Sequence, residues 1–434
     1  METVGGFAVH EILLRLSSKD AASLACVNSK FRIWASDETL WSNFCADELD
    51  LTSPVDPFGN PTSTFKEAYK RWKESFSMYP WPLVGRSKRC WDRIKSWFLA
   101  NFPEAFATLR AGASEDELTN LENQLNVKLP LPTRILYRFC DGQEFNEDDE
   151  GNTLDNWMGL IGGYIFYHQV VNVFLFPVRH VIAGTKNMLR QLDFPNRSKY
   201  IIVAASLTDC GKFFFLNCDN GQLFVGTENL TGSCKMMPCV PKSLISSMHD
   251  CDAMLLWLEE HSRRLHNGTI RVCKEGEVKY LNLFHEEPPL CTTAVTNGVK
   301  VRASAILVPE LSNLLREPAN YMFAYSIRIS LLPEGCIING MHFDSCQLLS
   351  RHWTIIADDV VVSNVNGEAV IGKYPLLFPG EREFVYESCS PLSSTSGSIE
   401  GSFTFVPGSL VNPKGSPFKV KVAQFPLKLP DYIF

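Results

Sequence analysis

The chain lacks the marks of a secreted, membrane-spanning or nucleic-acid-binding protein. Its first residues, METVGGFAVHEILLRL, have no basic lead and no small-residue cleavage site, so no secretory signal is predicted. The longest apolar stretch, residues 164–178, is interrupted by several polar residues and by Pro177, which a spanning helix tolerates poorly. The formal net charge of −7 leaves no general excess of Lys and Arg to neutralise phosphates, so a nucleic-acid surface is not expected.

Metal-binding cysteine pairs are also missing. The chain has fourteen cysteines but no Cys-x-x-Cys. A zinc site made from Cys234, Cys239, His249 and Cys251 would begin with a spacing at the edge of what structural zinc knuckles use. In a chain without a signal, the cysteines are predicted to be reduced thiols that fill apolar space. We therefore expect no metal or other cofactor, and a location in the cytoplasm, the nucleus or both.

Complete catalytic and phosphate-binding motifs are absent. Neither His-Glu-x-x-His nor Gly-x-Ser-x-Gly occurs. The acidic loop 144–155 fails as an EF-hand, because counting from Asn146 puts Trp157 at the twelfth position, where calcium needs Glu. The run 367–373 approaches a phosphate loop, but Tyr-Pro follows in place of Ser or Thr and a helix start. A tight turn is predicted there, and the chain is predicted not to be an enzyme.

The amino-terminal segment is rich in amphipathic helix patterns. The whole chain has 434 residues, of which 45% are hydrophobic and 21% charged, and this is enough for two or three soluble domains. Near the start, apolar residues recur with helical spacing at Val9, Ile12, Leu13 and Leu16. A cap at Ser17 then begins a second helix that carries Leu24 and Val27. So small a unit has little core of its own, which suggests that a partner covers part of its surface.

This segment resembles an F-box. The resemblance rests on the order of four pieces: residues 11–16 (EILLRL), 19–20 (KD), 27–31 (VNSKF) and 37–41 (DETLW). It implies docking on a Skp-family adaptor of a cullin ubiquitin ligase. The adaptor contacts that it implies are Val9, Ile12, Leu13, Leu16, Leu24 and Val27. Some of these residues must also fill the core of the unit, and the sequence does not apportion them.

The middle of the chain predicts an α+β domain. Residues 114–117 (SEDE) form a capping box before a helix, and a Leu-Pro turn at 129–130 leads into a second helix. Strands are predicted at 200–205, 212–218 and 222–227, followed by a helix over 241–264. With ENQLNVKLP at 122–130, this order resembles the SUKH superfamily, the Smi/Knr-type domain. That resemblance covers residues 96–265 and implies protein or peptide binding; the alternative is an unrelated α+β domain.

The last third predicts an antiparallel β-sandwich. Apolar and polar residues alternate around Ile327 and around Val420, and many Gly and Pro turns separate the strands. This part resembles the ApaG domain, which implies an immunoglobulin or fibronectin-like fold. The residues that carry the resemblance are Arg351, His352, Trp353, Gly367, Gly372, Pro375, Pro379 and Gly380. His352 has no identifiable acid-base partner, so a structural, hydrogen-bonded role is predicted for it.

The sequence thus predicts a multidomain chain. The expected parts are an all-α F-box at 1–50, a helical linker at 51–95, the SUKH-like domain at 96–265, a linker at 266–292 and the all-β ApaG domain at 293–434. The predicted function is a non-catalytic receptor for target proteins in an SCF (Skp-cullin-F-box) ubiquitin ligase. The alternatives are a protein-interaction scaffold without ubiquitin transfer, or a protein that binds a nucleotide or another small ligand.

Overall fold

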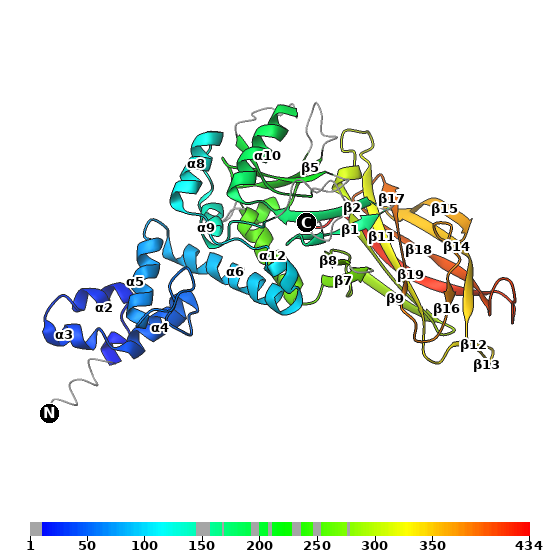
Figure 1. Ribbon diagram of the computed structural model, residues 1–434. Helices are drawn as coiled ribbons and strands as arrows, with labels where there is room; N and C mark the ends of the chain where they lie inside the picture. Colours follow the sequence, from blue (N-terminus) through cyan, green and yellow to red (C-terminus); the bar gives the residue numbers. More distant parts are fainter. Residues whose placement is uncertain are drawn as a thin grey trace.

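Three parts follow one another along an extended molecule. The computed structural model describes residues 11–144, 157–166, 169–191, 199–206, 211–227, 236–245, 253–275 and 278–434. Figure 1 shows small helices at the amino-terminal end (blue), a sheet with helices in the middle (green) and a β-sandwich at the far side (yellow to red). This arrangement confirms the predicted fold class, a multidomain chain with an all-α, an α+β and an all-β part.

Side-chain caps explain where the amino-terminal helices begin. The helices are α2 (Ser18–Leu24), α3 (Ser29–Trp34) and α4 (Glu38–Leu49). They follow the N-cap residues Ser17, Asn28 and Asp37, whose side chains accept hydrogen bonds from main-chain N–H groups of the first turn. Such a cap contributes about 1 kcal/mol, which matters in helices of six or seven residues.

A long helix joins this unit to the middle part. Helix α5 (Phe65–Ser75) packs on α4, and α6 (Trp81–Asn101) then runs from α4 to the middle domain, as Figure 1 shows. Gly85 permits the close approach at the α4 end, because a Cβ there would lie 2.8 Å from the main-chain oxygen of Glu48. In the middle of α6, Trp91 Nε1 donates to Leu136 O of the middle domain over 3.0 Å. The 21 residues of α6 span roughly 30 Å.

The middle domain is built on one eight-stranded sheet. Its order is β6-β5-β4-β3-β2-β1-β8-β7, antiparallel except for the parallel pair β1 and β8. The strands are β1 (Gly162–Phe166), β2 (Gln169–Leu175), β3 (Tyr200–Ser206), β4 (Lys212–Asn217), β5 (Leu223–Thr227), β6 (Met237–Pro238), β7 (Arg271–Glu275) and β8 (Val278–Asn282). The helices that accompany it are α7 (Pro103–Phe106), α8 (Glu115–Leu125), α9 (Leu131–Phe139), α10 (Val178–Gln191), α11 (Lys242–Ile245) and α12 (Ala253–His266).

Of two sequence predictions for this domain, the structure confirms one and contradicts part of the other. The capping box is confirmed, because Ser114 Oγ accepts from the Glu117 N–H while the Glu117 carboxylate accepts from the Ser114 N–H. The expected linker at 266–292 is wrong in part, because it contains β7 and β8, which extend the sheet of the middle domain. The two five-residue strands join the sheet through Gly163 and Asn282, which are far apart in sequence. The other domain boundaries stay predictions.

The carboxy-terminal part is a sandwich of two antiparallel sheets. One sheet has the order β17-β11-β10-β9 and the other β15-β14-β18-β19, with β16 also paired to β14. The strands are β9 (Cys291–Thr296), β10 (Val299–Leu307), β11 (Tyr321–Leu331), β12 (Cys336–Ile338), β13 (Met341–Phe343), β14 (Cys346–Ala357), β15 (Val360–Glu368), β16 (Leu376–Leu377), β17 (Phe384–Leu392), β18 (Ser396–Pro407) and β19 (Phe418–Lys428). A 3₁₀ turn, η3 (Pro309–Leu311), follows β10.

The sandwich and the middle domain share a buried polar boundary. Glu286 is buried and accepts from Arg302 at 2.9 Å and from Arg328 of β11. The buried carboxylate of Glu310, in η3, accepts from the Tyr164 hydroxyl of β1. Buried charges persist only where such partners satisfy them, so these contacts fix how the two parts meet.

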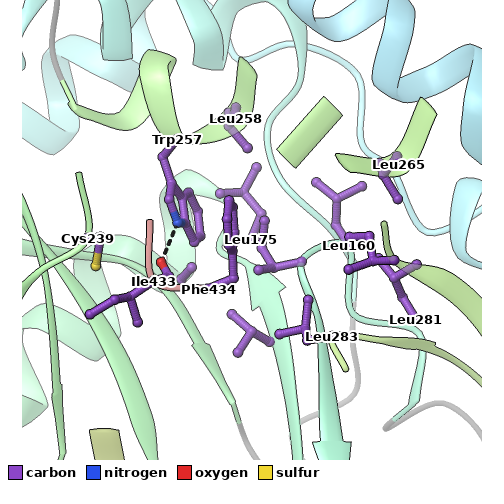
Figure 2. Packing of buried hydrophobic residues seen from close by; sticks show 14 of the residues in the cluster. Leu160, Leu175, Cys239, Trp257, Leu258, Leu265, Leu281, Leu283, Ile433 and Phe434 are labelled. Carbon is purple, nitrogen blue, oxygen red and sulfur yellow. Dashed lines mark hydrogen bonds between the residues drawn. The ribbon is translucent and has the colours of Figure 1, made fainter. Parts of the chain in front are cut away.

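Residues beyond β19 leave the sandwich and insert into the middle domain. Figure 2 shows Ile433 and Phe434 among apolar side chains of that domain, with Trp257 Nε1 donating to Ile433 O over 2.7 Å. The Phe434 ring stacks on Trp257 with centroids 5.4 Å apart. Fully buried Lys212 donates to the main-chain oxygen of Phe434 and, over 3.1 Å, to the Tyr164 hydroxyl. The last residues therefore lock the sandwich onto the middle sheet.

Candidate functional site

The amino-terminal helices combine buried apolar side chains with exposed ones. Leu13, Leu40 and Trp41 are buried, and Trp41 Nε1 donates to Ala35 O over 2.7 Å. Large apolar side chains remain exposed on the same unit. They are Ile12 at 59%, Leu14 at 36%, Val27 at 64% and Ile33 at 72%. Exposed apolar residues gathered on so small a unit are typical of a surface that another protein covers.

The predicted adaptor contacts fall into four groups. Ile12 and Val27 are exposed. Leu16 and Leu24 are partly buried and pack on the core. Leu13 has no exposed surface and belongs to that core. Val9 lies outside the described residues. Leu14 and Ile33 are exposed apolar residues that the sequence analysis did not select, because helical periodicity identifies an apolar face but not which members the unit covers itself.

The Arg-His-Trp run of the sandwich lies on β14. Trp353 points into the core, where its ring meets Phe403 edge-on at a centroid distance of 5.3 Å. Arg351 reaches across to the turn after β15 and donates to Ala369 O over 2.6 Å. His352 lies on the outer face, with Nε2 2.7 Å from Asn364 Oδ1 on β15. All three side chains thus hold β14, β15 and the sandwich core together.

Residues 367–373, which approach a phosphate-loop motif in sequence, contain the tight turn that was predicted. Val370 and Lys373 exchange main-chain hydrogen bonds of 3.0 and 2.8 Å around Ile371 and Gly372. Both of these residues have positive φ, 44° and 73°, which Gly372 adopts without strain. The chain then continues into β16, so the helix amino terminus that a Walker-type site requires is not formed here.

The other residues of the ApaG motif lie in the turns and strands next to β14. Pro375 O accepts from the Leu348 N–H at 3.0 Å, Pro379 bridges to Leu331, and Gly380 has φ 75°. Gly367 lies under the Arg351 guanidinium, which a Cβ at that position would meet at 3.2 Å. These residues support strand and turn geometry around β14.

The candidate metal sites lie largely beyond the described residues. The acidic loop is outside them from residue 145 to 156, as are Cys234, His249 and Cys251. Cys239 is buried, and loss of hydration raises the pKa of its thiol well above the ordinary value. Over the part of the chain that the structure describes, no group of three His, Cys, Asp or Glu could hold a metal, and no helix is long and apolar enough to cross a membrane.

The middle domain has perturbed titratable groups that serve packing. Burial lowers the pKa of His261 to about 4, and Nε2 of this residue lies 2.8 Å from Leu160 O. Burial, with nearby Arg264, also lowers the pKa of His285 to about 4. Burial likewise lowers the pKa of Lys212, although Glu310 opposes the shift. Each group lies at the junction with the inserted residues 431–434, so their environment reports on that contact.

Comparison with known proteins identifies three domains. Family profiles match the F-box domain at residues 8–43, the SMI1 / KNR4 family (SUKH-1) at 112–233 and the ApaG domain at 312–407. The chain is 55% identical to F-box protein SKIP16 of Arabidopsis thaliana over 441 residues, covering 100% of both. It is 24% identical to F-box only protein 3 of Homo sapiens, covering 97% of this chain and 81% of that protein. The putative ApaA protein from Bordetella pertussis has a crystal structure that is 33% identical over 30% of this chain and 94% of its own, with a TM-score of 0.26.

Three such domains in this order define a class, the F-box proteins that also carry a SUKH and an ApaG domain. Within that class, the chain belongs to the family of F-box protein SKIP16.

Proposed function

We propose that this chain is the substrate-recognition subunit of an SCF ubiquitin ligase. The F-box binds a Skp-family adaptor, and through it a cullin, while the SUKH and ApaG domains hold the target protein. The observation that carries the proposal is a set of exposed apolar side chains, Ile12, Leu14, Val27 and Ile33, on a helical unit that buries Leu13, Leu40 and Trp41. Membership of an F-box protein family supports it.

The arrangement of the domains suits a receptor that accelerates ubiquitin transfer by holding the target close to the enzyme. Helix α6 packs on α4 near its first turn, and on α12 and α9 along the rest of its length. Arg86 of α6 donates to Glu259 of α12 through two hydrogen bonds of 2.7 and 2.6 Å. A connector anchored in this way keeps the adaptor surface at a fixed distance from the target-binding domains. Holding target lysines near a ubiquitin-loaded enzyme raises their effective concentration, which accelerates transfer without a bond-making residue in this chain.

The test is reconstitution with purified adaptor and cullin. The full chain is expected to co-purify with both, whereas a Val27→Asp, Ile33→Asp variant is expected to lose them, because charge would be buried at the adaptor interface. Both positions are exposed in the free chain, so the substitutions leave its core intact. The matched control is Val411→Asp, at a valine that is 96% exposed in the sandwich.

The reconstitution, together with a nucleotide-binding assay, separates the alternatives. Adaptor capture without cullin would favour a scaffold outside ubiquitin transfer. Saturable nucleotide binding that is lost on Lys373→Ala would favour a ligand-binding protein. Retention of adaptor by the folded double variant, with unchanged circular dichroism, would reject the assignment of this surface.

A further inference from the structure

One edge of the sandwich displays an unusual density of exposed apolar side chains. Among the 21 large hydrophobic side chains that are exposed in the described residues, eight lie between residues 360 and 378. They are Val360, Val361, Val362, Val365, Ile371, Tyr374, Leu376 and Phe378. All belong to β15, to β16 or to the turns that adjoin them, on the side of β14 that faces away from β18. Such a concentration is typical of a protein-binding surface.

Strand β15 is also an edge strand, and a bulge, but no lysine or proline, protects it against pairing. It ends the sheet, so no other strand of the described residues pairs with its outer row of main-chain N–H and C=O groups. Its sequence, VVVSNVNGE, has no Lys, Arg or Pro. The opposite edge of the same sheet, β19, carries Lys419, Lys421, Pro426 and Lys428. A single bulge at Val362 interrupts β15, and residues 363–368 pair regularly with β14. Natural sheets place charges and proline on edges that must stay unpaired, so β15 contrasts with β19 in this respect.

The space beside β15 has room for side chains of an added strand. A hollow of about 580 Å³ opens between the edges of the two sheets. Trp353, Ile355 and Leu392 are among the residues that line it, together with Val365 of β15. Val365 lies opposite Trp353 in the β14–β15 ladder, on the inner face, yet is 37% exposed. Every second side chain of a strand paired to β15 would point into this hollow.

Negative charge at the start of β15 indicates what kind of strand could pair with this edge. Asp358 and Asp359 form the turn before it. Both are exposed, and no ion pair of the described residues includes either of them. A second copy of this chain fits poorly. Antiparallel pairing of two β15 strands centred on Asn364 brings Asp359 close to Glu368 of the copy, and parallel pairing brings Asp359 to itself.

We propose that β15 binds an extended segment of a partner protein by strand addition. The segment has apolar side chains at alternate positions, which enter the hollow, and a Lys or Arg at the end that meets Asp358 and Asp359. Main-chain hydrogen bonds supply affinity, while the hollow and the acidic turn supply specificity. This inference deepens the proposed function by naming the surface that holds the target, and its test uses neither adaptor nor cullin.

The probe is a phage-displayed library of random twelve-residue peptides, selected on the full chain. Selection is run with an excess of soluble Val361→Lys, Val365→Lys variant, so that only peptides specific for β15 are retained. Recovered peptides are expected to alternate apolar and polar residues, to lack Pro and to carry Lys or Arg at one end. Their Kd is expected to rise at least tenfold on the Val361→Lys, Val365→Lys variant and about fivefold on Asp358→Asn, Asp359→Asn, which keeps residues that tolerate the positive φ of the turn.

The matched control is Val295→Lys on β9, an edge strand of the other sheet where the valine is 54% exposed. It is expected to bind the peptides as the unmodified chain does. Slower amide hydrogen exchange over residues 363–368 in the complex would support strand addition. Recovery of no peptides, or of peptides that lack the apolar alternation or the basic end, would overturn the proposal. Self-association of the chain that Val361→Lys abolishes would overturn it too, in favour of a second copy. Adaptor binding is independent of these outcomes, so either proposal can fail alone.

Discussion

Removing the Phe434 ring tests how firmly the sandwich is locked to the middle domain. Phe434 is 7% exposed, stacks on Trp257 and lies under the Arg264 guanidinium, 4.7 Å from the ring centroid. Burial of a Phe side chain contributes about 2–3 kcal/mol, and the aromatic pair adds about 1 kcal/mol. Because the segment is free to shift and fill part of the space, we expect Phe434→Ala to lower the free energy of unfolding by about 3 kcal/mol.

Differential scanning calorimetry of the full chain is the assay. For a unit of about 150–250 residues, that loss corresponds to a fall in melting temperature of roughly 6–12 °C. The control is Phe58→Ala, at a ring that is 71% exposed, where a change below about 0.5 kcal/mol is expected. Trp257 fluorescence is expected to shift as water reaches its indole. Equal melting temperatures for Phe434→Ala and Phe58→Ala would refute the view that these last residues are a structural lock.

Three further outcomes follow from buried charges and caps. Glu286→Gln removes the buried carboxylate that Arg302 and Arg328 share, and only Arg302 then keeps an ion pair among the described residues, with Glu383, so chemical denaturation is expected to show a loss of about 3 kcal/mol. Ser114→Ala removes the reciprocal cap with Glu117 and is expected to cost about 1 kcal/mol in the same assay. The pKa of His261 is about 4 in the folded chain against an ordinary 6.5, so the unfolded chain binds the extra proton between these values. Stability is therefore expected to fall as the pH drops from 6.5 to 4, by about 3 kcal/mol from this group, and His261→Gln is expected to flatten that decline.

Some structural elements could be predicted from the sequence because they depend only on neighbouring residues. The Ser114–Glu117 cap, the alternation around Val420 and the turn at Gly372 each depend on a few neighbouring residues, and the structure has all three. Strands β7 and β8 were not foreseen, because a five-residue strand gains its place through pairing with a distant partner, here Gly163 with Asn282.

Burial on the amino-terminal helices depends on which side the rest of the chain covers. Leu13 and Ile12 are adjacent in one helical pattern, yet the first is buried and the second is 59% exposed. Periodicity could not separate them, because that choice is made by tertiary packing. The valines of β15 carried a readable signal that was not used: three consecutive apolar residues in an antiparallel strand must place at least one outward.

The most direct test of the receptor assignment is the affinity of the full chain for a purified Skp-family adaptor, measured by isothermal titration calorimetry. The account predicts saturable binding that an Ile12→Asp, Ile33→Asp variant weakens at least 100-fold, while Val295→Asp binds like the unmodified chain. Identical affinity of the folded double variant and the unmodified chain, or no binding by either, would contradict it.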